Sequence, residues 1–130
     1  MAVVVGAVVA IGLFMAIEGI STILHPWPEG FMGTLVEIAT HVKNYPAWVL
    51  ALLGVGYGLT TLVCTFLTTC IGSIERNLWF GYGVGALIFA MVVINLAMLP
   101  YPIWYWVFML TMLPIASLGG PKLDDRLAGY

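Results

Sequence analysis

Four long apolar stretches restrict the folds that this chain can adopt. They cover approximately residues 2–24, 47–71, 78–99 and 103–119. Each approaches or exceeds the length of about 17 to 25 residues with which an α-helix crosses a bilayer. We exclude strands because lipid satisfies no open sheet edge and a barrel would show shorter, alternating segments. The pattern predicts an all-α membrane protein, with a compact domain of four transmembrane helices over residues 1–119 and a short cytoplasmic tail over residues 120–130.

The composition supports the membrane class and excludes nucleic-acid binding. Of the 130 residues, 62% are hydrophobic and 8% are charged, against about 25% charged residues in soluble proteins. The net charge of −2 leaves no basic surface for a phosphate backbone. Cys64 and Cys70 lie six residues apart, a spacing that fits neither a CxxC redox pair nor a zinc site, so we interpret both as packing residues.

Residues 25–46 contain both histidines, two glutamates and one of the four basic residues. From about residue 30 to residue 43, apolar and polar positions recur with the period of a helix. The apolar positions are 31, 35, 38 and 42, and the polar positions are 34, 37, 41 and 44. This segment is too short and too polar to cross a bilayer. We therefore predict an amphipathic helix that lies in the outward membrane interface, between the first two spanning helices.

The basic residues predict the orientation. Arg76, Lys122 and Arg126 lie on one side of the predicted membrane and only Lys43 lies on the other. Because basic residues favour the cytoplasmic side, we expect both termini in the cytoplasm. Residues 2–24 lack a preceding basic segment and are long for a signal peptide, so we expect a retained helix. The expected location is the bacterial plasma membrane, that is, the cell inner membrane.

Glycine spacing predicts where helices pack closely. Gly54 and Gly58 form one GxxxG pattern, and Gly81 and Gly85 form a second one in the next span. Small residues at this spacing let helix backbones approach each other in lipid. The two pairs lie in opposite halves of the membrane, so each should meet a different helix. A partner subunit or a second copy of the chain is an alternative neighbour for either pair.

The order of these features resembles the DoxX-like group of four-helix membrane proteins. The resemblance covers residues 5–119 approximately and rests on the layout: a glycine-bearing first helix, an amphipathic segment closed by Tyr45-Pro46, a basic loop at Arg76 and two glycine-rich helices. Many members have a His-Gly pair late in the first helix, where this chain has Glu18-Gly19. The resemblance implies a link to quinone-dependent sulfur oxidation or to oxidative-stress complexes.

Two polar residues inside the predicted spans are candidates for a ligand pocket. Glu18 is an acidic residue within the first span, where a charge costs about 2.5 to 3.5 kcal/mol on insertion scales. Asn95 lies at a similar depth and could hydrogen-bond Glu18 across the bundle. The alternatives are that Glu18 reaches water at the outer interface and that Asn95 only joins helices. Tyr101 belongs to an aromatic group that forms either a belt at the interface or a stacking wall for a quinone or lipid headgroup.

His25, Glu37 and His41 complete the predicted outward pocket, with Glu37 and His41 above Glu18 and Asn95. Glu37 and His41 have the i, i+4 spacing of two metal ligands on one helix face. The HExxH and ExxH motifs are absent, however, which favours a solvated polar face over a metal site.

The sequence leaves two functional hypotheses open. The first and preferred one is a non-catalytic accessory or assembly subunit of a larger membrane complex, with the bilayer, other subunits or a second copy as partners. The second is a protein that handles a small molecule, including quinone- or lipid-linked redox chemistry, in the outward pocket. No catalytic residue or cofactor follows from the motifs.

Overall fold

The computed structural model describes residues 1–72, 78–127 and 129. Five helices are described: α1 (Ala2–Leu24), α2 (Leu35–Lys43), α3 (Ala47–Gly72), α4 (Trp79–Met98) and α5 (Ile103–Leu127), with no strand among the described residues. Four of them, α1, α3, α4 and α5, are long and apolar enough to cross a membrane. The all-helical prediction is confirmed, and these four helices indicate a small membrane protein.

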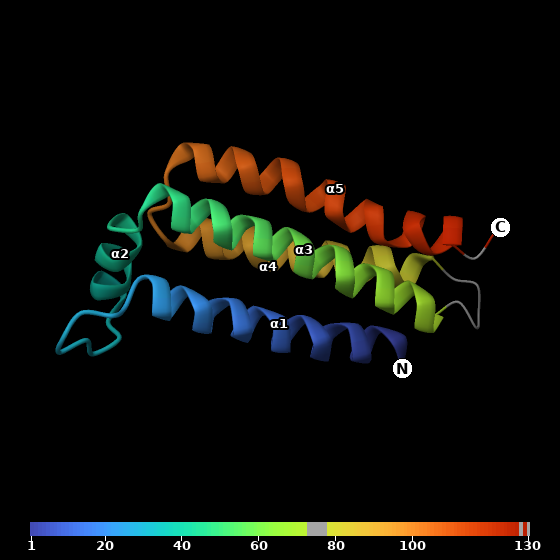
Figure 1. Ribbon diagram of the computed structural model, residues 1–130, viewed down its shortest axis with the longest axis horizontal. Helices are drawn as coiled ribbons and strands as arrows, with labels where there is room; N and C mark the ends of the chain where they lie inside the picture. Colours follow the sequence, from blue (N-terminus) through green and yellow to red (C-terminus); the bar gives the residue numbers. More distant parts are fainter. Residues whose placement is uncertain (73–77, 128, 130) are drawn as a thin grey trace.

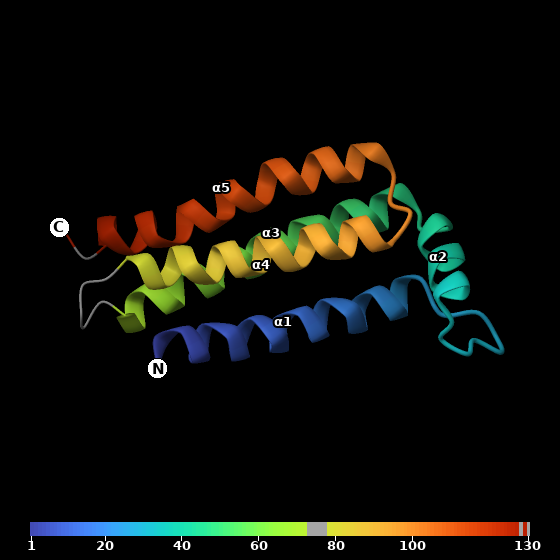
Figure 2. The same cartoon turned by 180° about the vertical axis from the view of Figure 1, so that it is seen from behind.

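The four long helices form one bundle in which α3 is the central member. α3 packs extensively against α5, α1 and α4, whereas α1 packs against α4 only slightly. Figures 1 and 2 show α2 across one end of the bundle, where the α4–α5 connection also lies. Both chain termini lie at the opposite end. This arrangement places all residues of the 25–46 segment at one end of the bundle.

The helix α2 is shorter than the predicted segment of residues 30–43. Gly30 and Gly33 have φ angles of 76° and 80°, which an α-helix does not accommodate, and the helix begins only after them. Thr34 is the N-cap, and its hydroxyl accepts a hydrogen bond from the backbone N–H of Glu37. The Glu37 carboxylate accepts one from the backbone N–H of Thr34 in return, which completes a capping box. The location of α2 in a membrane interface stays a prediction.

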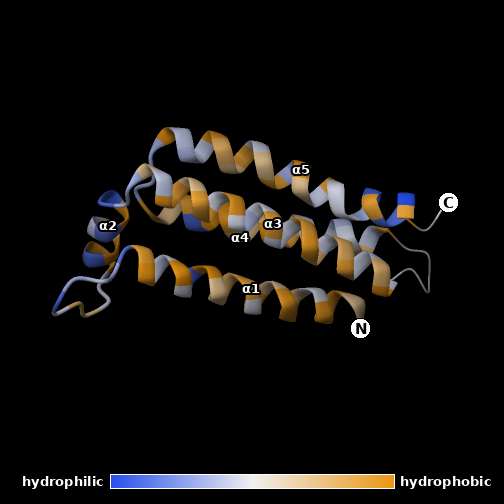
Figure 3. Ribbon diagram, viewed as in Figure 1, coloured by the Kyte–Doolittle hydropathy of each residue, from blue (hydrophilic) through white to orange (hydrophobic). Residues whose placement is uncertain are grey.

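The helix α5 continues well beyond residue 119, where we expected the last span to end and a frayed tail to begin. Gly120 lies directly on the backbone of α3: a Cβ there would be 2.6 Å from the Phe66 nitrogen and 2.9 Å from the Leu62 oxygen. Pro121 and Asp124 are also buried, and Asp124 accepts a hydrogen bond of 3.0 Å from the Cys70 thiol. Tertiary contact with α3 therefore maintains the helix to Leu127. In Figure 3 these last turns include the hydrophilic residues of α5.

The glycine pairs face neighbouring helices of the same chain. Gly58 would place a Cβ 2.7 Å from the Met112 sulfur of α5, and Gly54 faces Phe108 and Met109 on the same helix. In α4, a Cβ at Gly85 would lie 2.8 Å from the Ser117 Cβ, and one at Gly81 would lie 2.9 Å from the Thr65 carbonyl oxygen of α3. Both pairs thus lie at helix crossings inside the bundle.

Candidate functional site

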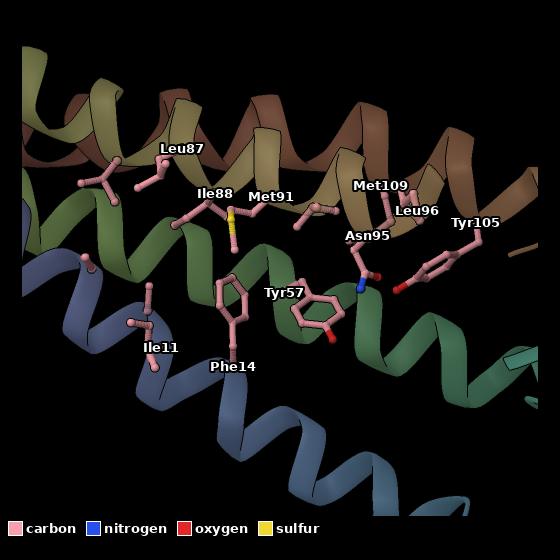
Figure 4. Close-up of a pocket in the computed structure, with 14 residues that line it drawn as sticks. Ile11, Phe14, Tyr57, Leu87, Ile88, Met91, Asn95, Leu96, Tyr105 and Met109 are labelled. Atoms are coloured by element: carbon pink, nitrogen blue, oxygen red, sulfur yellow. The ribbon is translucent and has the colours of Figure 1, made fainter. Parts of the chain in front are cut away.

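An apolar groove runs between α1 and α4 and has a volume of about 300 Å³. In Figure 4, Ile11 and Phe14 extend from α1, and Ile88 and Met91 extend from α4. The weak packing of α1 against α4 leaves this space open between the helices. Its lining residues are Ala7, Ala10, Ile11, Phe14, Tyr57, Val84, Leu87, Ile88, Met91, Val92, Asn95, Leu96, Tyr105 and Met109.

A second cavity of about 160 Å³, here called the polar chamber, lies at the end of the bundle near α2. Residues of all five described helices and of the three connections at this end, α1–α2, α2–α3 and α4–α5, contribute to its wall. Its polar and aromatic lining residues are Glu18, Trp27, His41, Tyr45, Tyr57, Asn95, Tyr101 and Tyr105. The chamber therefore contains four of the six predicted pocket residues, namely Glu18, His41, Asn95 and Tyr101.

The apolar groove and the polar chamber adjoin each other. Tyr57 of α3, Asn95 of α4 and Tyr105 of α5 line both cavities. Figure 4 shows these three side chains together at one end of the groove, with the aliphatic and Phe14 side chains along the rest of it. The chain thus presents an apolar compartment that leads to a polar one, as ligand sites for amphipathic molecules do.

Glu18 forms one edge of the polar chamber and is paired with a tyrosine. Its Oε1 atom accepts a hydrogen bond from the Tyr57 hydroxyl of α3. The Glu18 side chain also remains exposed at the surface of the bundle. Glu18 is therefore both a lining residue of the polar chamber and an exposed residue of the bundle, and its contact with water at the outer interface stays a prediction.

Asn95 is paired with a different tyrosine. Its Oδ1 atom lies 3.3 Å from the Tyr101 hydroxyl, which donates the hydrogen bond. Among the described residues, Glu18 and Asn95 do not hydrogen-bond each other as the sequence suggested, because each one is paired with a tyrosine instead. Burial raises the pKa of Tyr101, so its phenol keeps the proton that it donates.

Stacked rings cover the polar chamber. Trp27 lies between Phe31 and His41, with ring centroids 4.1 Å apart on each side. His41 then stacks on His25 at 4.3 Å, and His25 lies 4.7 Å from Tyr45. The Tyr45 hydroxyl in turn forms a hydrogen bond of 2.5 Å with Ser21 of α1. This ring stack holds residues 25–31 against α2 and leaves Trp27, His41 and Tyr45 on the chamber wall.

Glu37 does not belong to the polar chamber. Its Oε2 atom accepts hydrogen bonds from the backbone N–H of Thr34 at 3.0 Å and of Met32 at 3.2 Å, which lower the pKa of Glu37. The capping role directs this carboxylate to the start of α2, so Glu37 and His41 do not act together as ligands. Within the described part of the chain, no group of three or more His, Cys, Asp or Glu residues could hold a metal ion.

Tyr57 was not predicted as a site residue, and Tyr105 belongs to the same aromatic group as Tyr101, for which the sequence leaves an interfacial belt and a stacking wall open. Tyr57 and Tyr105 both line the chamber and the groove. The sequence feature that could have identified Tyr57 is its phenol group in the middle of a spanning segment, between Gly56 and Gly58. A hydroxyl at that depth requires a polar partner, which Glu18 supplies.

We expect the ring stack to weaken as the pH falls from about 8 to about 5. Burial lowers the pKa of His41, and the nearby His25 lowers it further, while a backbone hydrogen bond of His25 acts in the opposite direction. The unfolded chain therefore binds a proton at His41 at a higher pH than the folded chain does, so the free energy of unfolding decreases below a pH of about 6.5. Thermal unfolding of the wild type and of His41→Gln across this range measures the effect. An identical pH slope in both proteins would show that His41 is not the group responsible.

No protein-family model matches this chain, and neither a curated protein nor a solved structure is similar enough to indicate a relationship. The resemblance to the DoxX-like group stays a prediction for this reason. The function of the protein is therefore inferred from its two adjoining cavities, the polar chamber and the apolar groove.

Proposed function

We propose that this protein binds an amphipathic molecule of the membrane, with the polar part in the polar chamber and the apolar part in the apolar groove. The observation that carries the proposal is the junction of the two cavities at Tyr57, Asn95 and Tyr105. A mostly apolar site with a few convergent polar groups is the usual form of a small-molecule site. This proposal develops the lipid- or quinone-linked hypothesis and assigns no catalytic step.

The rim of the apolar groove is exposed, which supports the entry of a ligand's apolar chain into the groove from the lipid. Ile11 on α1 and Leu87 and Met91 on α4 line the groove and are 60%, 53% and 63% exposed. An apolar chain gains little free energy when it leaves lipid for an apolar groove, because both environments exclude water. The hydrogen-bonding groups of the polar chamber must therefore supply most of the selectivity, while the groove provides a matching shape for the chain.

A substitution at the rim tests the proposal. The side chain of Ile11→Trp would occupy the groove, whereas Val8→Trp is a matched control because Val8 is 63% exposed and does not line the groove. The proteins are extracted into polymer-bounded native nanodiscs, and their small-molecule content is measured by mass spectrometry. We expect one class of amphipathic molecule to be retained by the wild type and Val8→Trp, and to be lost at least partly from Ile11→Trp. Equal content in all three proteins would contradict the proposal.

A second candidate is the accessory subunit, and the exposed small residues of α1 favour it. Gly12, Ala16 and Gly19 follow one another at spacings of four and three residues, and all three are exposed. Apart from the adjoining backbone of α1 itself, no described atom lies within 4 Å of a Cβ built at Gly12 or Gly19, so another helix could approach closely there. The same native extraction separates the candidates. A stable protein partner without a retained small molecule would favour the accessory role.

A further inference from the structure

The polar chamber has an acid but no strongly basic side chain on its wall. Among the described residues that line the two cavities, Glu18 is the only one with a carboxyl group, and neither lysine nor arginine occurs. Lys43 lies on α2 but is exposed outside the chamber, and Lys122 and Arg126 lie in the C-terminal turns of α5, whereas the chamber adjoins its first turn at Tyr105. A carboxylate in a largely apolar surrounding is stabilised by a cation nearby, which the described wall does not provide.

Hydrogen bonds inside the chamber engage three of its phenol groups. The Tyr57 hydroxyl donates to Glu18, and the Tyr101 hydroxyl donates to Asn95. The Tyr45 hydroxyl is engaged with Ser21. The Glu18 carboxyl group, by contrast, keeps a second oxygen whose lone pairs can accept further hydrogen bonds. The chamber therefore offers an acceptor to a headgroup that donates hydrogen bonds or carries positive charge.

Aromatic rings make up much of the remaining chamber wall. Tyr57, Tyr101 and Tyr105 come from three different parts of the chain and line the same cavity, whereas the Trp27 ring on the wall is stacked between Phe31 and His41. The rings of Tyr101 and Tyr105 lie 5.0 Å apart at an angle of 33°. The faces of such rings carry partial negative charge and attract ammonium groups, and an aromatic cage beside a carboxylate is a common form of ammonium site.

From the acid, the second oxygen that it leaves available and the aromatic wall together, we infer that the headgroup bound in the polar chamber is a cation, namely an amine or a quaternary ammonium group attached to an apolar chain. This inference rests on the proposed function and adds the chemical class of the ligand. The Glu18 carboxylate and the aromatic rings contact the cation, and the apolar groove receives its chain. An anionic headgroup would meet the carboxylate without any lysine or arginine on the wall to offset the repulsion.

Four probes with the same twelve-carbon chain test the inference on the full chain in nanodiscs. They are dodecyltrimethylammonium, dodecylphosphocholine, dodecanol and dodecyl sulfate, each at a concentration that leaves the discs intact. Binding is measured by calorimetry against empty discs. We expect dodecyltrimethylammonium to bind about tenfold more tightly than dodecanol.

Glu18→Gln should remove this preference for dodecyltrimethylammonium. Glu29→Gln should retain it, because Glu29 is an exposed glutamate that does not line the chamber. Glu18→Asp keeps the charge and should show part of the preference for dodecyltrimethylammonium over dodecanol.

The outcomes separate this inference from the proposed function. If dodecylphosphocholine also binds, and its binding depends on Glu18, the natural ligand is a lipid with a choline headgroup. If only dodecyltrimethylammonium binds in this way, the natural ligand is a free amphipathic amine or ammonium compound. Equal, Glu18-independent binding of dodecanol and dodecyltrimethylammonium, or tightest binding of dodecyl sulfate, would overturn the cation inference and leave the proposed function intact. Binding of none of the four probes above the level of empty discs would overturn both.

Discussion

Gly120→Ala is expected to lower the free energy of unfolding by about 3 kcal/mol, at the upper end of the usual cost of overpacking. The added Cβ would lie 2.6 Å from the Phe66 nitrogen and 2.9 Å from the Leu62 oxygen, and both are backbone atoms of α3. A flexible side chain could rotate away from such a contact, but a helix backbone cannot. The helices α3 and α5 would have to move apart along their crossing, which is the most extensive contact in the bundle.

The neighbouring glycine provides a matched control. A Cβ at Gly119 would meet only the Cδ1 atom of Leu62 at 3.1 Å, which is the end of a side chain. Gly119→Ala should therefore leave stability unchanged or raise it by up to about 1 kcal/mol, because alanine favours the helix. Both variants are compared by thermal unfolding in the same nanodiscs. Similar stability of the two variants would show that the final turns of α5 do not lie on α3 as described.

Cysteine labelling is expected to give an all-or-none result for the orientation. In a background of Cys64→Ala and Cys70→Ser, Lys43→Cys should react with an impermeant maleimide in intact cells, whereas Lys122→Cys should react only after permeabilisation. Lys43 and Lys122 lie near opposite ends of the bundle, and α3 between these ends has 26 residues, or about 39 Å of helix. The predicted cytoplasmic termini follow from the basic residues.

Two different outcomes would contradict different parts of this prediction. The reverse labelling pattern would overturn the predicted orientation but not the four-span arrangement. Labelling of both positions from the same side would overturn the arrangement itself. A cysteine at Glu29, in the connection that leads into α2, serves as the control and should follow the behaviour of position 43 at the end of α2.

The positions of the polar residues show where prediction from the sequence succeeded and where it did not. Glu18 and Asn95 were recognised because polar groups are rare in apolar spans. Their actual partners, Tyr57 and Tyr101, were not identified, because a hydrogen bond across a bundle depends on how each helix is rotated about its axis. Glu37 was placed in the pocket from its spacing to His41, yet a local bond to Thr34 directs it elsewhere. Helix periodicity alone does not distinguish a capping carboxylate from a ligand.

The sequence by itself determined that four apolar helices would form and that a short polar helix would lie between the first two, since these depend on local composition and on the length of each segment. Only the tertiary structure decided that α5 extends to Leu127, because the contact of Gly120 with α3 outweighs the helix-breaking tendency of the Gly-Gly-Pro sequence at 119–121. It also decided that Tyr57, Asn95 and Tyr105 join a groove to a chamber. These residues come from three helices, and no pattern within one segment specifies which of their faces meet.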